Sequence, residues 1–335
     1  MENKTTKKVY LDDIAKELGV SKSTVSRAIS GKGRIGEETR QRILELIKEY
    51  NYRPNVIAKS LAQSKTFNIG VLLPADKGLS EVPFFQGCLM GICEIASAYD
   101  YDVVVSTSTS SDISQLKRLI ENRKVDGMIL TRSVINDLAI EYLKGEHIPF
   151  VLIGSCEDDD IIQIDTDHTS ACLEMTSYLL SSGCKKLALL IGNESHVVNN
   201  CRRDGYLLAY DKGGIPVDES IIYHDMTSTG VIERAVADLL SKGCDSVVCG
   251  DDYICSKVLS SLEEKGIEIP AKIKVASFYN SAFLKSHNPA ITAINIDVHE
   301  LGMTAGRTII DLLGNKDVSP KVLLGYELSI KKSSF

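Results

Sequence analysis

From residue 68 onward, short runs of Val, Ile, Leu and Ala alternate with segments whose apolar residues follow a helical period. A near-continuous apolar run is typical of a strand buried on both faces, and such strands form parallel sheets covered by helices. The runs predict more strands than one sheet comfortably holds, so we expect two similar α/β lobes with a break near residues 164–167. The runs are 69–73, 103–105, 128–130, 150–153, 187–191, 247–249 and 275–278.

The first 53 residues carry a different pattern, which predicts a head of three short helices. Residues 11–18 place their apolar side chains on one face, Gly19 permits a sharp turn, and Val20 fills the corner. Ser21 is a good N-cap for a second helix that runs to about residue 30, and a third helix follows. The side chains expected inside the head are Ile14, Ala15, Leu18, Val25, Ala28, Ile29, Ile43, Leu44 and Ile47.

The charge of the chain is unevenly divided. Residues 1–65 hold 14 Lys and Arg against 8 Asp and Glu, a net charge of +6, whereas the remainder holds 24 against 37, a net charge of −13. The net charge of −7 for the whole chain would argue against nucleic-acid binding, but a basic head on an acidic body favours it. We therefore expect the head to meet nucleic acid or another anionic surface while the body does something else.

Composition excludes several classes of protein. With 44% hydrophobic and 25% charged residues, the chain is ordinary for a globular protein, so disorder is ruled out as its main description. No apolar run approaches the length of about 18 residues that a membrane helix needs, and the first residues lack the apolar stretch of a secretory signal. The nine cysteines are scattered and never spaced C-x-x-C. Buried free thiols in a reducing cytoplasm are therefore favoured over disulfides or zinc.

Motifs for catalysis or cofactor binding are absent or lack their structural context. The stretch Gly31-Lys32-Gly33-Arg34-Ile35-Gly36 matches a dinucleotide-binding fingerprint, but a predicted helix rather than a strand precedes it. The acidic run at 157–160 lacks the glycine and ligand spacing of a calcium loop, and the six histidines show no metal-ligand spacing. The chain is therefore predicted to be no enzyme and to carry no cofactor or metal.

The first two helices form a predicted helix-turn-helix around Gly19, where the small Ala15 allows a close approach. The second helix then presents hydrogen-bonding side chains to base edges and phosphates. Arginine can bond bidentately to guanine and lysine reaches guanine or phosphate, whereas Ser21 and Thr24 suit phosphate better. The alternative is a solvated face of a small helical bundle. The candidate DNA contacts in the head are Ser21, Lys22, Ser23, Thr24, Ser26, Arg27, Lys32 and Arg34.

Several stretches of the head resemble the LacI/GalR family of bacterial transcription regulators. They are Ile14-Ala15, Leu18-Gly19-Val20-Ser21, Thr24-Val25-Ser26-Arg27, Glu38-Thr39-Arg40 and Asn51-Tyr52-Arg53-Pro54-Asn55. The resemblance implies that Lys22, Ser23 and Arg27 read bases. It also implies that residues 54–61 become a hinge helix on the operator, with Leu61 as a minor-groove wedge and further contacts from Asn55 and Ala58. Tyr10 departs from the threonine that usually caps the first helix of this family.

The predicted hinge is short. Residues 55–61 make only about two turns, below the length at which an isolated helix persists, so we expect the hinge to order only against DNA and a partner hinge. Inserting a wedge costs free energy because it unstacks bases, and the additional contacts between the bent DNA and the protein offset that cost. An ordinary linker is the alternative. The expected domains are a helix-turn-helix head at 1–53, a hinge and linker at 54–65, and a body at 66–335.

The body resembles the effector domain of the same family, and the resemblance covers about residues 9–330. It implies a fold similar to periplasmic sugar-binding proteins, with a ligand in the cleft between two lobes. The expected lobes are about 66–166 with 295–322, and about 167–294 with 323–335. The matching motifs are Pro83-Phe84-Phe85, Val125-Asp126-Gly127, Asp165-Thr166-Asp167, Arg202-Arg203-Asp204-Gly205-Tyr206, Gly250-Asp251-Asp252 and Pro289-Ala290-Ile291-Thr292.

This resemblance gives the candidate effector-binding residues. Arg202 matches the family's R-x-x-G-[FY] arginine and would donate to hydroxyls, or to a phosphate or carboxylate; a surface ion pair is the alternative. Asp251 matches a cleft Asn or Asp, whereas Asp252 is expected to cap the helix after it. The remaining candidates are Phe84 and Phe85, which supply a stacking face or belong to the core, and Arg132 and Asp167, whose alternatives are a solvated loop arginine and a helix cap.

Tyr279 is an informative departure, because the family commonly has Asp there, within a G-[FY]-D motif. Losing the carboxylate removes one acceptor for a hydroxyl and adds a ring that can stack. An aromatic residue that often precedes the position of Gly230 is also missing. The ligand is therefore expected to be larger, or less polar on that side, than a simple monosaccharide.

These features together predict a ligand-responsive transcription regulator. A homodimer would place two heads on a pseudo-palindromic operator, and a small carbohydrate or related metabolite would change the angle between the lobes and so form or melt the hinge helices. Repression released by ligand is the commoner behaviour in the family; co-repression and activation are alternatives. A solute-binding receptor would use the same body but requires export.

Overall fold

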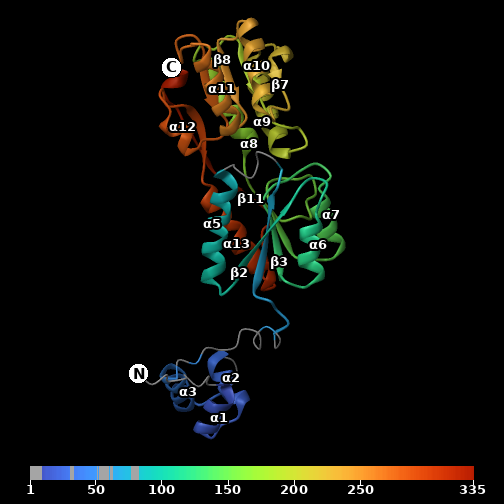
Figure 1. Ribbon diagram of the computed structural model, residues 1–335, viewed down its shortest axis with the longest axis vertical. Helices are drawn as coiled ribbons and strands as arrows, with labels where there is room; N and C mark the ends of the chain where they lie inside the picture. The colour runs from blue at the N-terminus through green and yellow to red at the C-terminus, as the bar shows by residue number, and fades with distance from the viewer. Residues whose placement is uncertain (1–9, 31–33, 51, 53–59, 61–62, 77–82) are drawn as a thin grey trace, which may run out of the picture. The chain divides into compact units, whose positions relative to one another are not determined.

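The computed structural model describes residues 10–30, 34–50, 52, 60, 63–76 and 83–335. Contacts within the chain divide it into two units, Met1–Lys65 and Thr66–Phe335 (Figure 1). Among its described residues, the first unit contains the helices α1 (Leu11–Leu18), α2 (Lys22–Ser30) and α3 (Glu37–Glu49), which surround a core formed by Ile14, Ala15, Val25, Ala28 and Ile43.

The turn between α1 and α2 depends on Gly19. This residue ends α1 in the left-handed conformation, with a φ of 66°, and the Val20 amide donates to the Ala15 carbonyl at 3.0 Å. At the start of α1, the Tyr10 amide donates to Asp13 Oδ2 at 2.9 Å, so half of a capping box persists without the threonine. The expectation that Leu44 points inward is wrong: the residue is 45% exposed, because it follows Ile43 by one position on α3 and lies off the buried face.

The second unit contains two lobes, each built on a six-stranded sheet. The sheet of the first lobe has the order β11-β5-β4-β3-β1-β2, and all its strand pairs are parallel. Its strands are β1 (Asn68–Pro74), β2 (Asp102–Ser108), β3 (Gly127–Leu130), β4 (Phe150–Ile153), β5 (Gln163–Thr166) and β11 (Lys321–Leu324). The helices that cover it are α5 (Pro83–Ala98), α6 (Ser114–Glu121), α7 (Leu138–Gly145) and α13 (Val298–Leu313).

The sheet of the second lobe has the order β12-β10-β9-β8-β6-β7, and only the β10–β12 pair is antiparallel. Its strands are β6 (Leu187–Leu190), β7 (Ile222–Tyr223), β8 (Ser246–Cys249), β9 (Lys274–Ser277), β10 (Thr292–Ile296) and β12 (Tyr326–Ser329). Its helices are α8 (His168–Ser181), α9 (Val197–Gly213), α10 (Thr229–Ser241), α11 (Asp252–Glu264), α12 (Ala282–Ser286) and the short η1 (Glu219–Ile221) and η2 (Lys332–Ser334).

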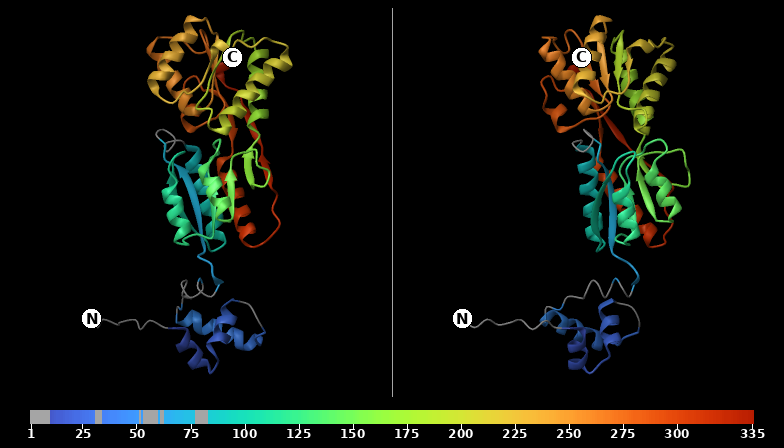
Figure 2. Two further views of the ribbon diagram at one scale, coloured as in Figure 1. Left: turned by 90° about the vertical axis from the view of Figure 1, so that its right-hand side faces the viewer. Right: turned by 45° about the vertical axis from the view of Figure 1, so that its right-hand side comes forward.

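The chain crosses between the lobes three times, from β5 to α8, from β10 to α13 and from β11 to β12 (Figure 2). In each lobe the helices cover both faces of the sheet, and apolar clusters fill the space on either side. The predicted fold class, a small helical head and a two-lobed α/β body with parallel sheets, is confirmed. Both sheets therefore turn the carboxyl ends of their parallel strands toward the space between the lobes, where ligands of open α/β folds bind.

Candidate functional site

The second helix of the head presents one polar face. Val25 and Ala28 are buried, which turns Lys22, Ser26 and Arg27 outward as exposed side chains. Lys22 forms an ion pair with Asp12 of α1. The candidate contacts Ser21, Ser23 and Arg34 are also exposed and Thr24 is half-buried, whereas Lys32, Asn55, Ala58 and Leu61 lie outside the described residues.

Ser21 caps α2, as expected from the sequence. The Thr24 amide donates to Ser21 Oγ at 3.1 Å, and the Ser21 and Thr24 hydroxyls are 2.8 Å apart. An N-cap side chain satisfies one of the helix amides that have no partner within the helix. This bond orients the first turn of α2, which is the part of a recognition helix that approaches the bases.

Replacing Ser21 by alanine is expected to lower the local stability of the head by about 1 kcal/mol, because the Thr24 amide loses its acceptor. Hydrogen exchange of the α1 and α2 amides in the full-length chain would measure the loss. Ser26→Ala is the matched control, since Ser26 is exposed within the same helix. Equal protection in the two variants would contradict the capping role.

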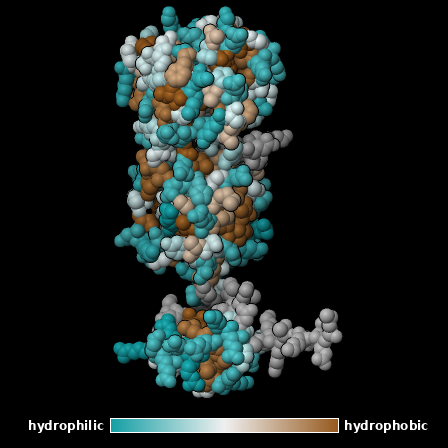
Figure 3. Space-filling view, turned by 90° about the vertical axis from the view of Figure 1, so that its left-hand side faces the viewer, coloured by the Kyte–Doolittle hydropathy of each residue, from teal (hydrophilic) through white to brown (hydrophobic). Residues whose placement is uncertain are grey.

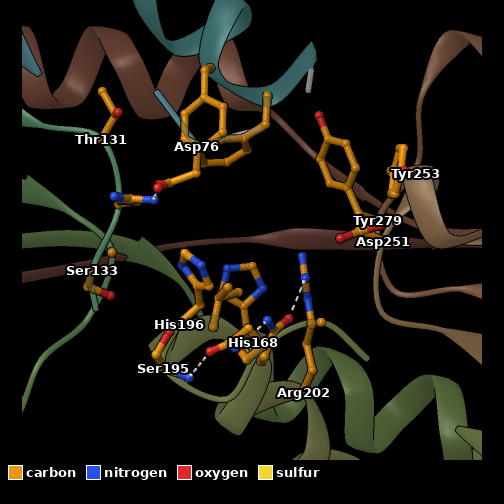
Figure 4. A pocket seen from close by; sticks show the side chains of 18 of the residues that line it. Asp76, Thr131, Ser133, His168, Ser195, His196, Arg202, Asp251, Tyr253 and Tyr279 are labelled. Carbon is orange, nitrogen blue, oxygen red and sulfur yellow. Dashed lines mark hydrogen bonds and ion pairs between the residues drawn. The ribbon is translucent and has the colours of Figure 1, made fainter. Parts of the chain in front are cut away.

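A cavity of about 390 Å³ lies between the two lobes of the body (Figure 4). Six of the seven candidate effector residues line it: Phe84, Phe85, Arg132, Arg202, Asp251 and Tyr279. The seventh, Asp167, does not. Its Oδ1 accepts the Ser170 amide at 2.9 Å as the N-cap of α8, so the helix-cap alternative describes it.

An aromatic cluster closes one side of the cavity. The rings of Phe84 and Phe85, at the start of α5, meet edge to face with centroids 5.4 Å apart. Phe84 also meets Tyr279 of the other lobe edge to face at 6.2 Å, so the cluster spans the two lobes. Burial raises the pKa of Tyr279, which keeps the phenol protonated as a hydrogen-bond donor. The cluster can cover the apolar face of a ring-shaped ligand.

Two charged pairs line the cavity, one within the first lobe and one where β5 leads into α8, and the sequence analysis found only one of their four members, Arg132. Arg132 forms an ion pair with Asp76, which follows β1. Asp165 Oδ1 lies 3.3 Å from His168 Nε2, and the Ser155 hydroxyl donates to Asp165 Oδ2 at 2.7 Å. Burial alone would raise the pKa of Asp165, but the His168 imidazole and the hydrogen bonds from Ser155 and a backbone amide hold it below its usual value.

In the second lobe, Arg202 points from α9 into the cavity, toward the side on which Tyr279 and Asp251 lie (Figure 4). Its guanidinium Nη1 donates to Asn199 Oδ1 at 3.3 Å, and the residue is only 7% exposed. The alternative of a surface ion pair is therefore wrong for this arginine. A buried guanidinium facing a cavity is suited to hydroxyl or oxyanion groups of a ligand.

Of the two consecutive aspartates at the start of α11, Asp251 takes both of the roles that were expected of the pair. Asp251 caps the helix, because its Oδ1 accepts the Ile254 amide at 2.8 Å, and the residue also lines the cavity. Asp252 is the first residue of α11 and is buried. Burial and the neighbouring Asp251 raise the pKa of Asp252. The expectation that Asp252 provides the cap is thus wrong by one position.

The lobes also touch directly beside the cavity. The Ile135 amide of the first lobe donates to the Ser195 carbonyl at 2.8 Å, and the Val197 amide of the second lobe donates to the Ser133 carbonyl at 3.3 Å. Val134 and His196 form the bridge between these bonds. The side chains of His196, Ser133 and Ser195 line the cavity (Figure 4), so a ligand there would contact the same segments that join the lobes.

Within the described part of the chain, no group of three or more His, Cys, Asp or Glu side chains is placed to hold a metal ion. No helix in that part is long and apolar enough to span a bilayer.

The chain matches two protein-family models. Residues 66–324 match the periplasmic binding proteins and sugar binding domain of the LacI family, and residues 10–55 match the bacterial regulatory proteins of the lacI family. It is 28% identical to the HTH-type transcriptional regulator RegA of Clostridium saccharobutylicum, over 97% of this chain and 98% of that protein. It is also 28% identical to catabolite control protein A of Priestia megaterium, over 97% and 99%.

Two solved structures with a similar fold align with this chain over almost its whole length. A lac repressor dimer bound to operator and the anti-inducer ONPF superposes with a TM-score of 0.80 at 23% identity, over 98% of this chain and 99% of that one. A complex of the transcriptional regulator CelR with cellobiose gives a TM-score of 0.75 at 23% identity, over 97% and 99%.

Proposed function

The chain belongs to the LacI family of bacterial regulatory proteins, and we propose that it is a repressor whose operator affinity is controlled by a small carbohydrate or related metabolite. As a member of this family it is a DNA-binding transcription regulator and not an enzyme. The observation that carries the effector half of the proposal is the interlobe cavity, where six candidate residues from both lobes converge.

The chemistry of the cavity suits a carbohydrate. The cluster of Phe84, Phe85 and Tyr279 offers ring faces and edges for the apolar side of a sugar, and Arg202 and Asp251 offer a donor and an acceptor for hydroxyls. The CelR structure holds cellobiose in a protein of the same fold, which supports a saccharide for this chain as well.

Control of the operator would work through the contact between the lobes. A ligand that binds more tightly when the lobes are closed favours the state with the Ile135–Ser195 and Val197–Ser133 hydrogen bonds. It can shift the equilibrium only by its difference in affinity for the open and closed states. We propose a head at 1–53, a hinge at 54–65 and a body at 66–335, with Asn55, Ala58 and Leu61 of the hinge contacting the operator.

The regulator acts as a homodimer, and the surface that pairs two copies is proposed from the exposed apolar residues of the body. Met90 of α5, Val105 of β2 and Phe283 of α12 are 57%, 48% and 51% exposed. Figure 3 shows apolar patches on the face of the body that carries α5. Two such copies would place two heads on a pseudo-palindromic operator in the cytoplasm.

The test is selection of duplexes from a random DNA pool by the full-length protein. We expect an inverted repeat, and we expect Arg27→Ala and Lys22→Ala each to relax preference at a defined base pair of the half-site by about 1–3 kcal/mol. Lys48→Ala is the matched control, because it removes the same charge from an exposed site on α3. Enrichment of no duplex would contradict the regulator, and equal losses on all sequences would make Lys22 and Arg27 phosphate contacts.

A further inference from the structure

We propose that the effector is a sugar acid whose carboxylate pairs with Arg202. This inference rests on the proposed function, in which the interlobe cavity is the effector site. Arg202 is only 7% exposed. Among the described residues its one hydrogen bond goes to a neutral amide, Asn199, at 3.3 Å, and its Nε is buried without a partner.

A buried guanidinium without a counter-charge is unfavourable, because it has lost water and gained no acid in exchange. Solvent cannot reach the enclosed Nε. The lost hydration of the guanidinium can therefore be replaced only by a group in the cavity that binds its Nη atoms. No ion pair within 4 Å joins Arg202 to an acid of the described chain. The cavity itself is therefore the place from which the missing negative charge would come.

The other basic groups that line the cavity do not share this deficit. Arg132 is paired with Asp76, and His168 lies 3.3 Å from Asp165. Burial and the nearby Arg132 lower the pKa of His196, so that its imidazole is neutral near pH 7. Within the described lining, Arg202 is thus the permanent cation without an acidic partner.

Tyr279 stands where the family commonly has Asp, and its phenol cannot supply the negative charge of that carboxylate. Its phenol has a pKa raised by burial and stays neutral. The aromatic cluster of Tyr279, Phe84 and Phe85 would pack against the sugar ring of the ligand. Arg202 would pair with the carboxylate attached to that ring. A carboxylate suits the site better than a phosphate dianion, because Asp251 and Asp165 also line the cavity and would repel the second negative charge.

The first experiment measures binding of the full-length protein to pairs of pyranoses that differ only by oxidation at C6, such as glucuronate with glucose and galacturonate with galactose, and to the matching 6-phosphates. We expect at least one uronate to bind about tenfold or more tightly than its neutral parent, which corresponds to about 1.4 kcal/mol. Arg202→Met should remove that preference. Arg203→Gln should keep it, because Arg203 is bonded to Glu194 outside the lining.

The second experiment needs no ligand. If the Arg202 charge is uncompensated in the free protein, Arg202→Met should raise the melting temperature by about 2 °C or more, since methionine fills a similar volume without a charge. A lower melting temperature would mean that the chain itself satisfies the guanidinium, and would overturn the inference. So would equal or tighter binding of the neutral sugars or the phosphates, or no binding of any uronate. A measurement of operator binding distinguishes this inference from the proposed function. If neutral sugars release the protein from the operator, the sugar-acid effector is contradicted but the carbohydrate-controlled repressor is supported.

Discussion

Replacing Gly302 by valine is expected to lower the free energy of unfolding of the body by about 3 kcal/mol, because α5 and α13 pack backbone to backbone at this position. A Cβ atom on Gly302 would lie 2.1 Å from the Cys88 carbonyl oxygen and 2.9 Å from its Cα. The reciprocal position behaves in the same way, since a Cβ on Gly91 would lie 2.1 Å from the His299 carbonyl oxygen. Backbone atoms cannot rotate out of the way, so the two helices would have to separate.

Urea unfolding of the full-length chain measures this loss, and Gly145→Ala is the control. Gly145 lies at the exposed end of α7, where an added Cβ meets nothing within 4 Å. Its replacement should leave stability unchanged or raise it by at most about 1 kcal/mol. A midpoint for Gly302→Val that matches the unsubstituted chain would show that the helices can move apart at no cost, and that the first lobe is not held by this contact.

The sequence predicts six of the eight inner strands and the edge strand β2. Continuous apolar runs identify β1, β3, β4, β6, β8 and β9, because these strands are covered on both faces. The edge strands β11 and β12 carry only partly buried or exposed residues and are not among the predicted strands. β5 is missed for another reason. It is fully buried yet polar, because Gln163 accepts the Cys156 amide at 2.9 Å and Asp165 faces the cavity.

The roles of several residues in the candidate site could not be predicted from their positions in the sequence. The sequence leaves Asp167 equally at a helix start or in the cleft, and it assigns Asp251 to the cleft and the helix cap to Asp252. Only the structure shows that Asp167 is a cap alone, whereas Asp251 caps with one oxygen and still lines the cavity. Asp76 was missed because its role depends on a partner that the fold brings close. Asp76 lies 56 positions from Arg132, and no periodicity links residues that far apart.

Operator affinity is expected to fall by about three decades or more between 50 and 200 mM salt, if a dimer neutralises six or more phosphates. The physical reason is the division of charge. The first unit, Met1–Lys65, carries a net charge of +6 and the second carries −13, so attraction to DNA comes from the head and is opposed by the body. Each phosphate that a lysine or arginine neutralises releases condensed counterions, and added salt reduces that gain.

Measuring operator affinity at several salt concentrations gives the slope of log affinity against log salt concentration. Two variants then show which residues contribute to that slope. Arg34→Ala, in the exposed loop before α3, should reduce the slope by about one for each subunit if it contacts a phosphate. Lys316→Ala should not change it, because Lys316 is bonded to Asp311 at 2.7 Å in the acidic body. A reduced slope for Lys316→Ala would place DNA against the body, and a slope near zero would remove the electrostatic basis for the head as the DNA-binding unit. The salt dependence thus tests a property of the charge distribution that holds whichever bases Lys22 and Arg27 contact.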